Sequence, residues 1–139
     1  MSAVQLEFHG VNRMASQGIE EFAKILVRHV RDAAIHDCDM DCRSECGSVG
    51  AKRWRAAGIN DSALLARIMI PDCIDAAIFW LLDAIDQGTL KLQYIAEDGS
   101  VVDLAKQGLG ELGGWYVGND GWRQRYSEER LNSFVRDED

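Results

Sequence analysis

The sequence predicts an α+β fold, namely a mainly helical single domain over residues 1–139 with one antiparallel β-hairpin packed on a central apolar helix. Residues 17–35 and 71–88 repeat apolar side chains at the three- and four-residue spacing of amphipathic helices. After residue 88 the apolar period shortens to two around Asp98-Gly99, as in a half-buried hairpin. No repeat, heptad run or linker divides the chain, and its length suits one ordinary core.

The first expected helix, residues 17–35, has apolar side chains on one face and charged side chains on the other. The apolar face holds Ile19, Phe22, Ala23, Leu26, Val30, Ala33 and Ala34. Ser16 is suited to cap this helix, and the acids that follow favour the positive end of the helix dipole. His29 lies at the edge of the apolar face, and we interpret it as a partly buried helix residue instead of a general base.

The middle of the chain, residues 36–60, is polar and is expected to be irregular. Gly47 and Gly50 should end any helix that continues through the cysteines. A short helix is expected from Asp61 or Ser62 to Met69. The basic run around Trp54 is interpreted as a solvated face instead of a phosphate-binding patch.

Pro71 then suits the first position of a new helix, where its missing N–H has no cost. The apolar stripe of this helix is so wide that we expect it to be the central and most buried helix. Asp72 and Asp75 are assigned to its polar edge, where they favour its N-terminus electrostatically. Gly88 is expected to end the helix in the left-handed conformation.

The hairpin is expected to follow directly. Leu90, Leu92 and Tyr94 alternate with polar residues, Asp98-Gly99 predicts a two-residue turn, and residues 100–104 return as the second strand. The chain then becomes rich in glycine, and a short helix is expected over residues 127–135, before the acidic end.

The glycine-rich stretch contains Gly108-x-Gly110-x-x-Gly113, the spacing that holds a dinucleotide pyrophosphate in some enzymes. That interpretation requires a preceding parallel strand and a second strand afterwards, and neither is visible in the sequence. Glu111 inside the motif would also repel phosphate. The glycines are therefore expected to fold a compact loop around large rings, and no cofactor is predicted.

Aromatic residues of this loop are the predicted anchors of a protein interface. Trp115 follows two glycines beside the hairpin and is expected to be core, whereas Trp122 follows a turn and is expected to be exposed. Since Trp, Tyr and Arg are the usual anchors of interfaces, the predicted partner-binding residues are Asp120, Trp122, Arg123, Arg125 and Tyr126. The alternative is that the aromatics serve only as core.

Three cysteines, Cys38, Cys42 and Cys46, would share one face of a continuing helix. Zinc sites usually combine tightly spaced pairs from two elements, and the second pair is missing here, since Cys73 is the only distant thiol. No metal is therefore predicted, and no nucleophile, acid–base pair or other catalytic residue can be selected from spacing.

The net charge of −8 lies entirely in the second half of the chain. Residues 1–70 hold nine basic and nine acidic side chains, whereas residues 71–139 hold six and fourteen. Such a surface repels nucleic acid and anionic membranes and attracts a basic partner, although acidity can also serve solubility alone. The absence of a long apolar run or signal sequence, together with the crowded thiols, predicts a cytoplasmic location.

The second half of the chain resembles a group of small, uncharacterised bacterial proteins. The similarity rests on AIDQG, the Asp-Gly hairpin, GLGELGGWYVGNDGWR and YSEER. This group is associated with immunity proteins of bacterial toxin systems, and the resemblance implies no cofactor and no catalytic residue.

Two hypotheses about function follow. The first is an acidic cytoplasmic binding protein that neutralises or regulates a basic protein partner, such as a toxin domain blocked by its immunity protein. The alternative is a small enzyme or a metal or redox protein centred on Cys38–Cys46.

Overall fold

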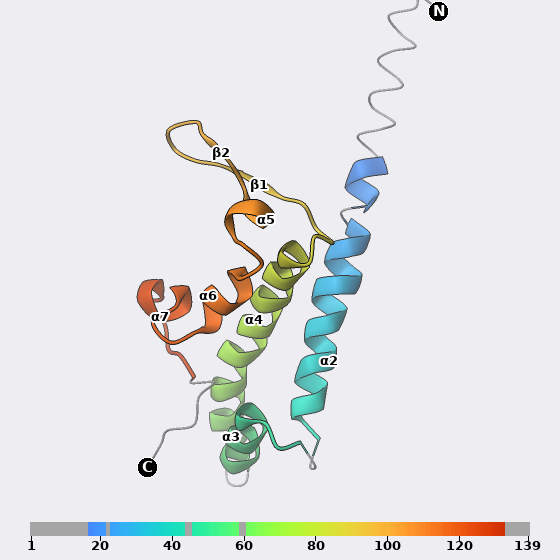
Figure 1. Ribbon diagram of the computed structural model, residues 1–139. Helices are drawn as coiled ribbons and strands as arrows, with labels where there is room; N and C mark the ends of the chain where they lie inside the picture. Colours follow the sequence, from blue (N-terminus) through green and yellow to red (C-terminus); the bar gives the residue numbers. More distant parts are fainter. Residues whose placement is uncertain (1–16, 22, 44–45, 59–60, 133–139) are drawn as a thin grey trace, which may run out of the picture.

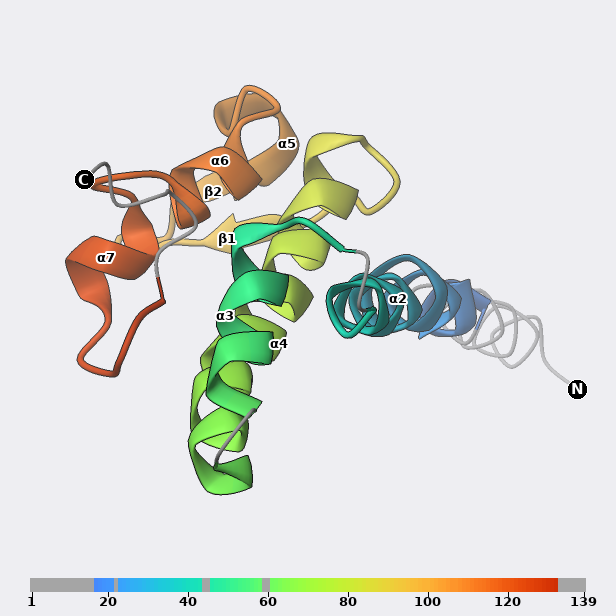
Figure 2. The same ribbon diagram turned by 90° about the horizontal axis from the view of Figure 1, so that it is seen from below.

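The computed structural model describes residues 17–21, 23–43, 46–58 and 61–132. These residues form a mainly helical α+β fold with one two-stranded antiparallel hairpin, which confirms the predicted fold class. The central helix, α4 (Ser62–Asp86), lies between the first helical segment on one side and the short C-terminal helices on the other (Figures 1 and 2).

The first helical segment continues further than the sequence predicted. Residues 17–21 and 23–25 are helical, the π-helix η1 (Leu26–Arg31) follows, and α2 (Asp32–Asp41) continues it to the cysteines. Val30 and Ala34, which belong to the predicted face, are the buried residues of η1 and α2, whereas Ile19, Ala23 and Leu26 of the same face are exposed. The predicted cap Ser16 and Phe22 lie outside the described residues. His29, which was expected to be partly buried, is exposed, because the buried face of this helical segment is narrower than the predicted apolar face.

A helix also stands where the middle segment was expected to be irregular. This helix, α3 (Val49–Gly58), includes Gly50, and the Ser48 hydroxyl accepts a hydrogen bond of 3.0 Å from the Ala51 N–H at its start. Its small residues let it pack closely on α4, with Ala51, Trp54 and Ala57 buried. Trp54 is therefore a core residue and does not belong to a solvated basic face.

The helix α4 is one continuous element, and the prediction of two helices separated at Pro71 was wrong. Pro71 has no N–H for the carbonyl of Arg67, one turn earlier. The Nε of Arg130 donates to that carbonyl at 3.1 Å, and the Nδ2 of Asn132 donates to the next carbonyl, that of Ile68, at 2.8 Å. The C-terminal segment thus satisfies backbone groups at the proline, and the helix can continue through it.

Both ends of α4 are defined by side-chain and backbone chemistry. The Asp61 carboxylate accepts hydrogen bonds from the N–H groups of Ala63 and Leu64, which makes it the N-cap. Gly88 adopts a φ of 75° just after the helix, as expected for a left-handed stop. A hydrophobic core cluster lies at this C-terminal end and consists of Val30, Ala84, Ile85, Leu90 and Leu112.

The hairpin pairs β1 (Gln93–Ile95) with β2 (Val101–Asp103), with Tyr94 opposite Val102. Leu90 and Leu92, just before β1, pack in the core at the end of α4. The paired strands project away from α4 (Figure 1). The turn holds three residues, 97–99, instead of two, since the Ala96 N–H bonds to the Ser100 carbonyl across it.

Three short helices follow the hairpin, namely α5 (Leu104–Gln107), α6 (Leu112–Val117) and α7 (Trp122–Tyr126). The expected helix over residues 127–135 is not formed in its first part, because residues 127–132 are irregular, and residues 133–135 lie outside the described residues. The two tryptophans are placed opposite to prediction. Trp122 packs against the core, whereas Trp115 is 36% exposed and touches the Trp122 ring at a centroid distance of 6.0 Å.

Candidate binding face on the central helix

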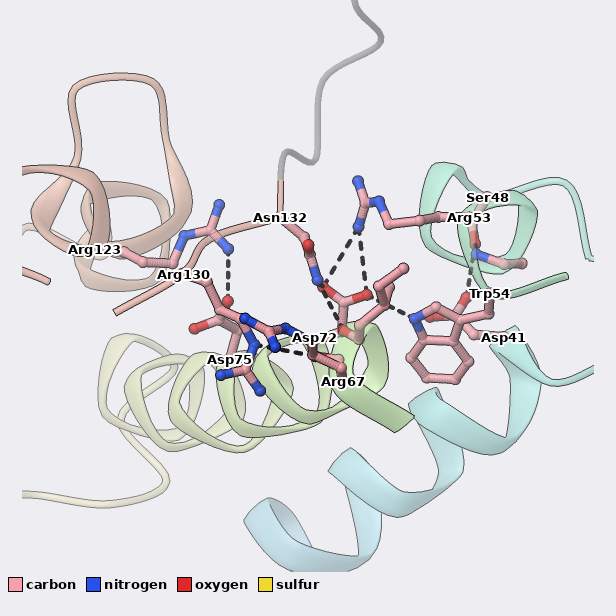
Figure 3. A network of polar contacts seen from close by, with 12 residues as sticks. Asp41, Ser48, Arg53, Trp54, Arg67, Asp72, Asp75, Arg123, Arg130 and Asn132 are labelled. Atoms are coloured by element: carbon pink, nitrogen blue, oxygen red, sulfur yellow. Dashed lines mark hydrogen bonds and ion pairs between the residues drawn. The ribbon is translucent and has the colours of Figure 1, made fainter. Parts of the chain in front are cut away.

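Two buried carboxylates, Asp72 and Asp75, lie one turn apart on α4 and are only 7% and 5% exposed. The sequence predicts them at the polar edge of a helix N-terminus. That assignment was wrong, because α4 begins at Ser62 and both residues lie well inside it. A buried carboxylate needs partners that offset its desolvation, and each of these two has them (Figure 3).

Asp75 joins α4 to α6 and α7. The Tyr116 hydroxyl donates to one carboxylate oxygen and the Arg123 guanidinium to the other, both at 2.6 Å. The Arg123 and Asp75 side chains are only 9% and 7% exposed, so this is a largely desolvated ion pair. Burial, and then the hydrogen bond to Asp75, raise the pKa of Tyr116 well above its usual value, so the hydroxyl stays protonated as a donor.

Asp72 joins α4 to α3 and to the C-terminal segment. The indole Nε1 of Trp54 donates to it at 2.6 Å, the guanidinium of Arg53 lies at 3.3 Å, and the amide of Asn132 donates at 3.1 Å (Figure 3). Both oxygens of this carboxylate therefore accept hydrogen bonds. The two aspartates therefore have a structural role: their carboxylate oxygens accept hydrogen bonds from other elements of the protein and hold those elements on α4.

An apolar groove of about 740 Å³ runs between α4, α7 and the segment that follows α7. Its apolar lining includes Ile70, Ile74, Ile78, Leu82, Trp122 and Tyr126. Ile70 and Ile74 are 50% and 54% exposed and Tyr126 is 71% exposed, so the groove presents large apolar side chains to solvent. Such a cluster is typical of a surface that binds another molecule.

The predicted partner-binding residues gather at this end of the molecule but divide into two groups. Trp122, Arg123 and Tyr126 line the groove, whereas Asp120 and Arg125 line a smaller hollow of about 380 Å³ beside Trp115. The Arg123 guanidinium is bound to Asp75, and the Arg125 guanidinium lies 5.1 Å from the centre of the Tyr126 ring. Asp120, Arg125 and Tyr126 are thus the exposed residues of this set, whereas Trp122 and Arg123 are partly buried.

A second cavity, of about 350 Å³, opens on the other side of Asp75, which lines both hollows. Its walls come from α2, α3, α4 and α6, and include four carboxylates and two aromatic rings: Asp37, Asp41, Asp72, Asp75, Trp54 and Phe79. Asp37 accepts a hydrogen bond from the Trp80 indole at 3.2 Å, and Asp41 accepts one from the Ser48 hydroxyl at 2.7 Å. We name this hollow the acidic cavity.

The cysteines are not arranged as a helix face. Because α2 ends at Asp41, Cys42 is its C-cap and Cys46 lies beyond it, where its thiol contacts Asp41 and Ser48. Burial, followed by contact with Cys73, raises the pKa of Cys38 to about 12. The pKa of Cys42 is also raised, first by burial and then by Asp39. A raised pKa disfavours the thiolate, which is the form in which a cysteine acts as a nucleophile.

Across the described segments of the chain, no three His, Cys, Asp or Glu side chains are placed to hold one metal ion.

The glycine motif holds an anion, but that anion is a side chain of the protein. At the start of α6, the Leu112 N–H donates to one carboxylate oxygen of Asp86 and the Gly113 N–H donates to the other, both at 3.0 Å. Gly113 is required for this close approach, since a Cβ there would lie 2.9 Å from the Phe79 ring. The N–H groups that a phosphate would need are thus engaged by α4.

Sequence reasoning missed the acidic cavity, the groove and the paired aspartates. Their residues come from distant segments, such as Asp72 and Asn132, which are 60 positions apart, so no local motif joins them. One signal was present, namely Asp72 and Asp75, two acids three residues apart in a largely apolar helix, although Asp83 and Asp86 have the same spacing.

Within the described residues, no helix is long and apolar enough to cross a membrane. Comparisons with family models, with curated proteins and with solved structures found no match to this chain.

Proposed function

We propose that this chain is an acidic binding protein that neutralises a basic protein partner in the cytoplasm, and that the partner is a bacterial toxin domain for which it serves as the immunity protein. The observation that carries the proposal is the apolar groove along α4, with Ile70, Ile74 and Tyr126 at least half exposed. Covering a toxin in this way needs surface complementarity and no chemistry of the binding protein itself.

The groove has the composition expected of an interface. Its isoleucines and Tyr126 supply apolar contact area, and Glu129 and Arg130 are among its charged lining residues. An apolar centre with a polar rim is the usual anatomy of protein interfaces. The Asp75–Arg123 ion pair joins α4 to α7, the two helices that line the groove, and so fixes their relative position.

The charge of the chain favours a basic partner. The acidic excess falls in residues 71–139, which include α7 and most of α4. A basic toxin domain would be attracted over several ångströms and oriented before contact, which raises the association rate.

The test is capture of the partner with variants of the groove. Purified protein is used as bait in lysate of the native organism, and the captured protein is identified and expressed alone. We expect it to be basic and toxic to cells, with growth restored by co-expression of this chain.

Ile74→Ser is expected to abolish rescue and to weaken binding at least about tenfold, which is the effect of losing an interface anchor. Ile35→Ser is the matched control, because Ile35 is also a helical isoleucine and is 44% exposed, but it lies outside the groove. Equal binding by both variants would exclude the groove as the toxin-binding surface, and a captured partner that is harmless would exclude the immunity role.

A further inference from the structure

We propose that the acidic cavity is a recognition pocket for one arginine side chain of the partner. The guanidinium would lie between Asp37 and Asp41, and the aliphatic stem would pack against Trp54 and Phe79. This inference rests on the proposed function and names the chemical group that the partner must present.

The size and walls of the cavity suit a single side chain. Its volume of about 350 Å³ is at the small end of ligand pockets and far too small for a folded element. Trp54 and Phe79 provide flat apolar surface, and Ala76, Val49 and Val117 are small neighbours that leave the space open. The cavity is thus an apolar slot with carboxylates at its wall.

The charges of the cavity are only half compensated by the protein. Asp72 and Asp75 are paired with Arg53 and Arg123. Asp37 and Asp41 line the α2 wall, and within the described residues neither of them forms an ion pair. The cavity therefore carries negative charge that a cation from outside can neutralise.

Asp37 and Asp41 are also oriented in advance. They lie one helical turn apart on α2. Asp37 accepts a hydrogen bond from Trp80, and the Oδ1 of Asp41 accepts hydrogen bonds from the Ser48 hydroxyl and, at 3.7 Å, from the Cys46 thiol. Each carboxylate retains further acceptor capacity, since an ionised carboxylate has about four lone-pair sites. Gly50 has no side chain beside the Asp41 carboxylate, where a Cβ would lie 3.4 Å from the Asp41 Oδ2. The space next to this oxygen is therefore left open.

Arginine fits this arrangement better than lysine. A guanidinium is planar, donates in several directions at once and stacks on aromatic rings, so it can bridge two carboxylates while its face lies on an indole. The cavity and the groove both border Asp75, so the two hollows lie on adjacent sides of α4. That adjacency favours a side chain of the partner over a free small molecule.

The experiment observes the four tryptophan indole signals by ¹⁵N NMR during titration with Nα-acetyl-arginine N-methylamide. Trp54 and Trp80 donate to carboxylates of the cavity, whereas Trp115 and Trp122 lie outside its lining and act as internal controls. We expect saturable shifts of the Trp54 and Trp80 signals, with a Kd on the order of millimolar. The citrulline analogue, which is similar in shape but uncharged, should cause no saturable shift.

Substitutions of aspartates on α2 distinguish specific recognition of arginine in the cavity from general attraction by negative charge. Asp37→Asn combined with Asp41→Asn keeps both side chains as hydrogen-bond acceptors and should weaken arginine binding at least about tenfold, since charge-assisted bonds are lost. Asp39→Asn removes one charge from an exposed position on the same helix and should change binding less than about twofold. Backbone spectra of each variant confirm that the fold is retained.

Several outcomes would overturn the inference. These are the absence of a saturable shift, equal binding of citrulline, equal effects of Asp39→Asn, and movement of the Trp122 signal alone. Binding of putrescine more than about tenfold tighter than the arginine probe would assign the cavity to free amines. If Ile74→Ser prevents toxin binding while the doubly substituted Asp37→Asn, Asp41→Asn protein binds normally, the proposed function stands and the arginine pocket is rejected.

Discussion

At the scale of single residues, Asp75 shows how a buried charge holds several elements together. Its two oxygens bind Tyr116 and Arg123, and removal of the carboxylate would leave the Arg123 guanidinium buried without its partner. Breaking one side of a buried pair costs about 3–5 kcal/mol, because the remaining charge is uncompensated. We therefore expect Asp75→Ala to lower the free energy of unfolding by that amount in urea titrations.

The control for this prediction is Asp83→Ala, on the same helix, which should cost less than about 1 kcal/mol. A second check is the double variant Asp75→Ala, Arg123→Met, which removes both charges and should be more stable than Asp75→Ala alone. A loss for Asp75→Ala no larger than that for Asp83→Ala would show that the pair contributes little.

Cys38 provides a prediction about pH. Burial, contact with Cys73 and the nearby Asp37 and Asp41 carboxylates raise its pKa from 9.0 to about 12, so folding favours the protonated thiol. Its contribution to stability is complete below pH 9 and is lost as the pH rises toward 12. At pH 9, iodoacetamide should modify Cys38 much more slowly in the native protein than in urea, as measured by peptide mass spectrometry. Equal rates in the two states would contradict the raised pKa.

The roles of these residues could be predicted only in part. Acids at Asp72 and Asp75 are visible in the sequence, but their burial depends on Trp54, Tyr116 and Asn132, which lie on other elements. The tryptophans were assigned from local turn signals. The Trp122 ring nevertheless reaches the core, because α7 packs back on α6, a contact that the adjacent sequence does not encode.

At the scale of elements, Asp86 shows how α4 and α6 are joined. It accepts from the N–H groups of Leu112 and Gly113, which have no partner within α6. Loss of a side-chain cap of this kind typically costs about 1–2 kcal/mol. Asp86→Ala should lower the free energy of unfolding by about that amount, measured by thermal or urea unfolding.

Glu111→Gln is the matched control for the cap, since Glu111 stands at the N-cap position of α6 but forms no side-chain cap hydrogen bond. Its effect should stay within about 0.5 kcal/mol. Equal losses for the two variants would show that Asp86 acts only through general charge.

Elements with strong periodicity were predicted, and those formed by tertiary contacts were not. The helix along residues 17–35, the apolar helix that ends before Gly88 and the hairpin all followed from period and turn residues. The continuity of α4 through Pro71 could not be predicted, because it depends on donors from Arg130 and Asn132.

The short α6 and α7 are too brief to produce a helical period. Gly113 and Gly114 further concealed α6, because glycine disfavours a helix interior.

At the scale of the whole molecule, the groove and the acidic cavity form only when distant elements of the chain pack together. The groove needs α4 beside α7, and the acidic cavity needs α2, α3 and α6 around the same helix. Because each hollow draws on distant segments, the sequence indicated the region of Trp122 and Tyr126 but not the groove floor at Ile70 and Ile74. The acidic second half of the chain was the whole-molecule property that composition did reveal.

That acidity leads to a prediction about association kinetics, measured with the captured partner. Exposed charges act over about a Debye length, roughly 30 Å at 0.01 M and 8 Å at 0.15 M ionic strength. We expect the association rate to fall at least about tenfold between these two conditions, with a smaller change in the dissociation rate.

The location of the steering charge is tested by two variants that remove the same charge. Glu128 and Glu129 are exposed, and Glu129 lines the groove, whereas Glu20 and Glu21 are exposed on the first helical segment. Replacing the first pair by glutamine should slow association more than replacing the second pair, because the attraction acts most strongly near the face that makes contact. Equal effects would mean that only total charge matters, and a rate indifferent to salt would mean that the acidity serves solubility alone.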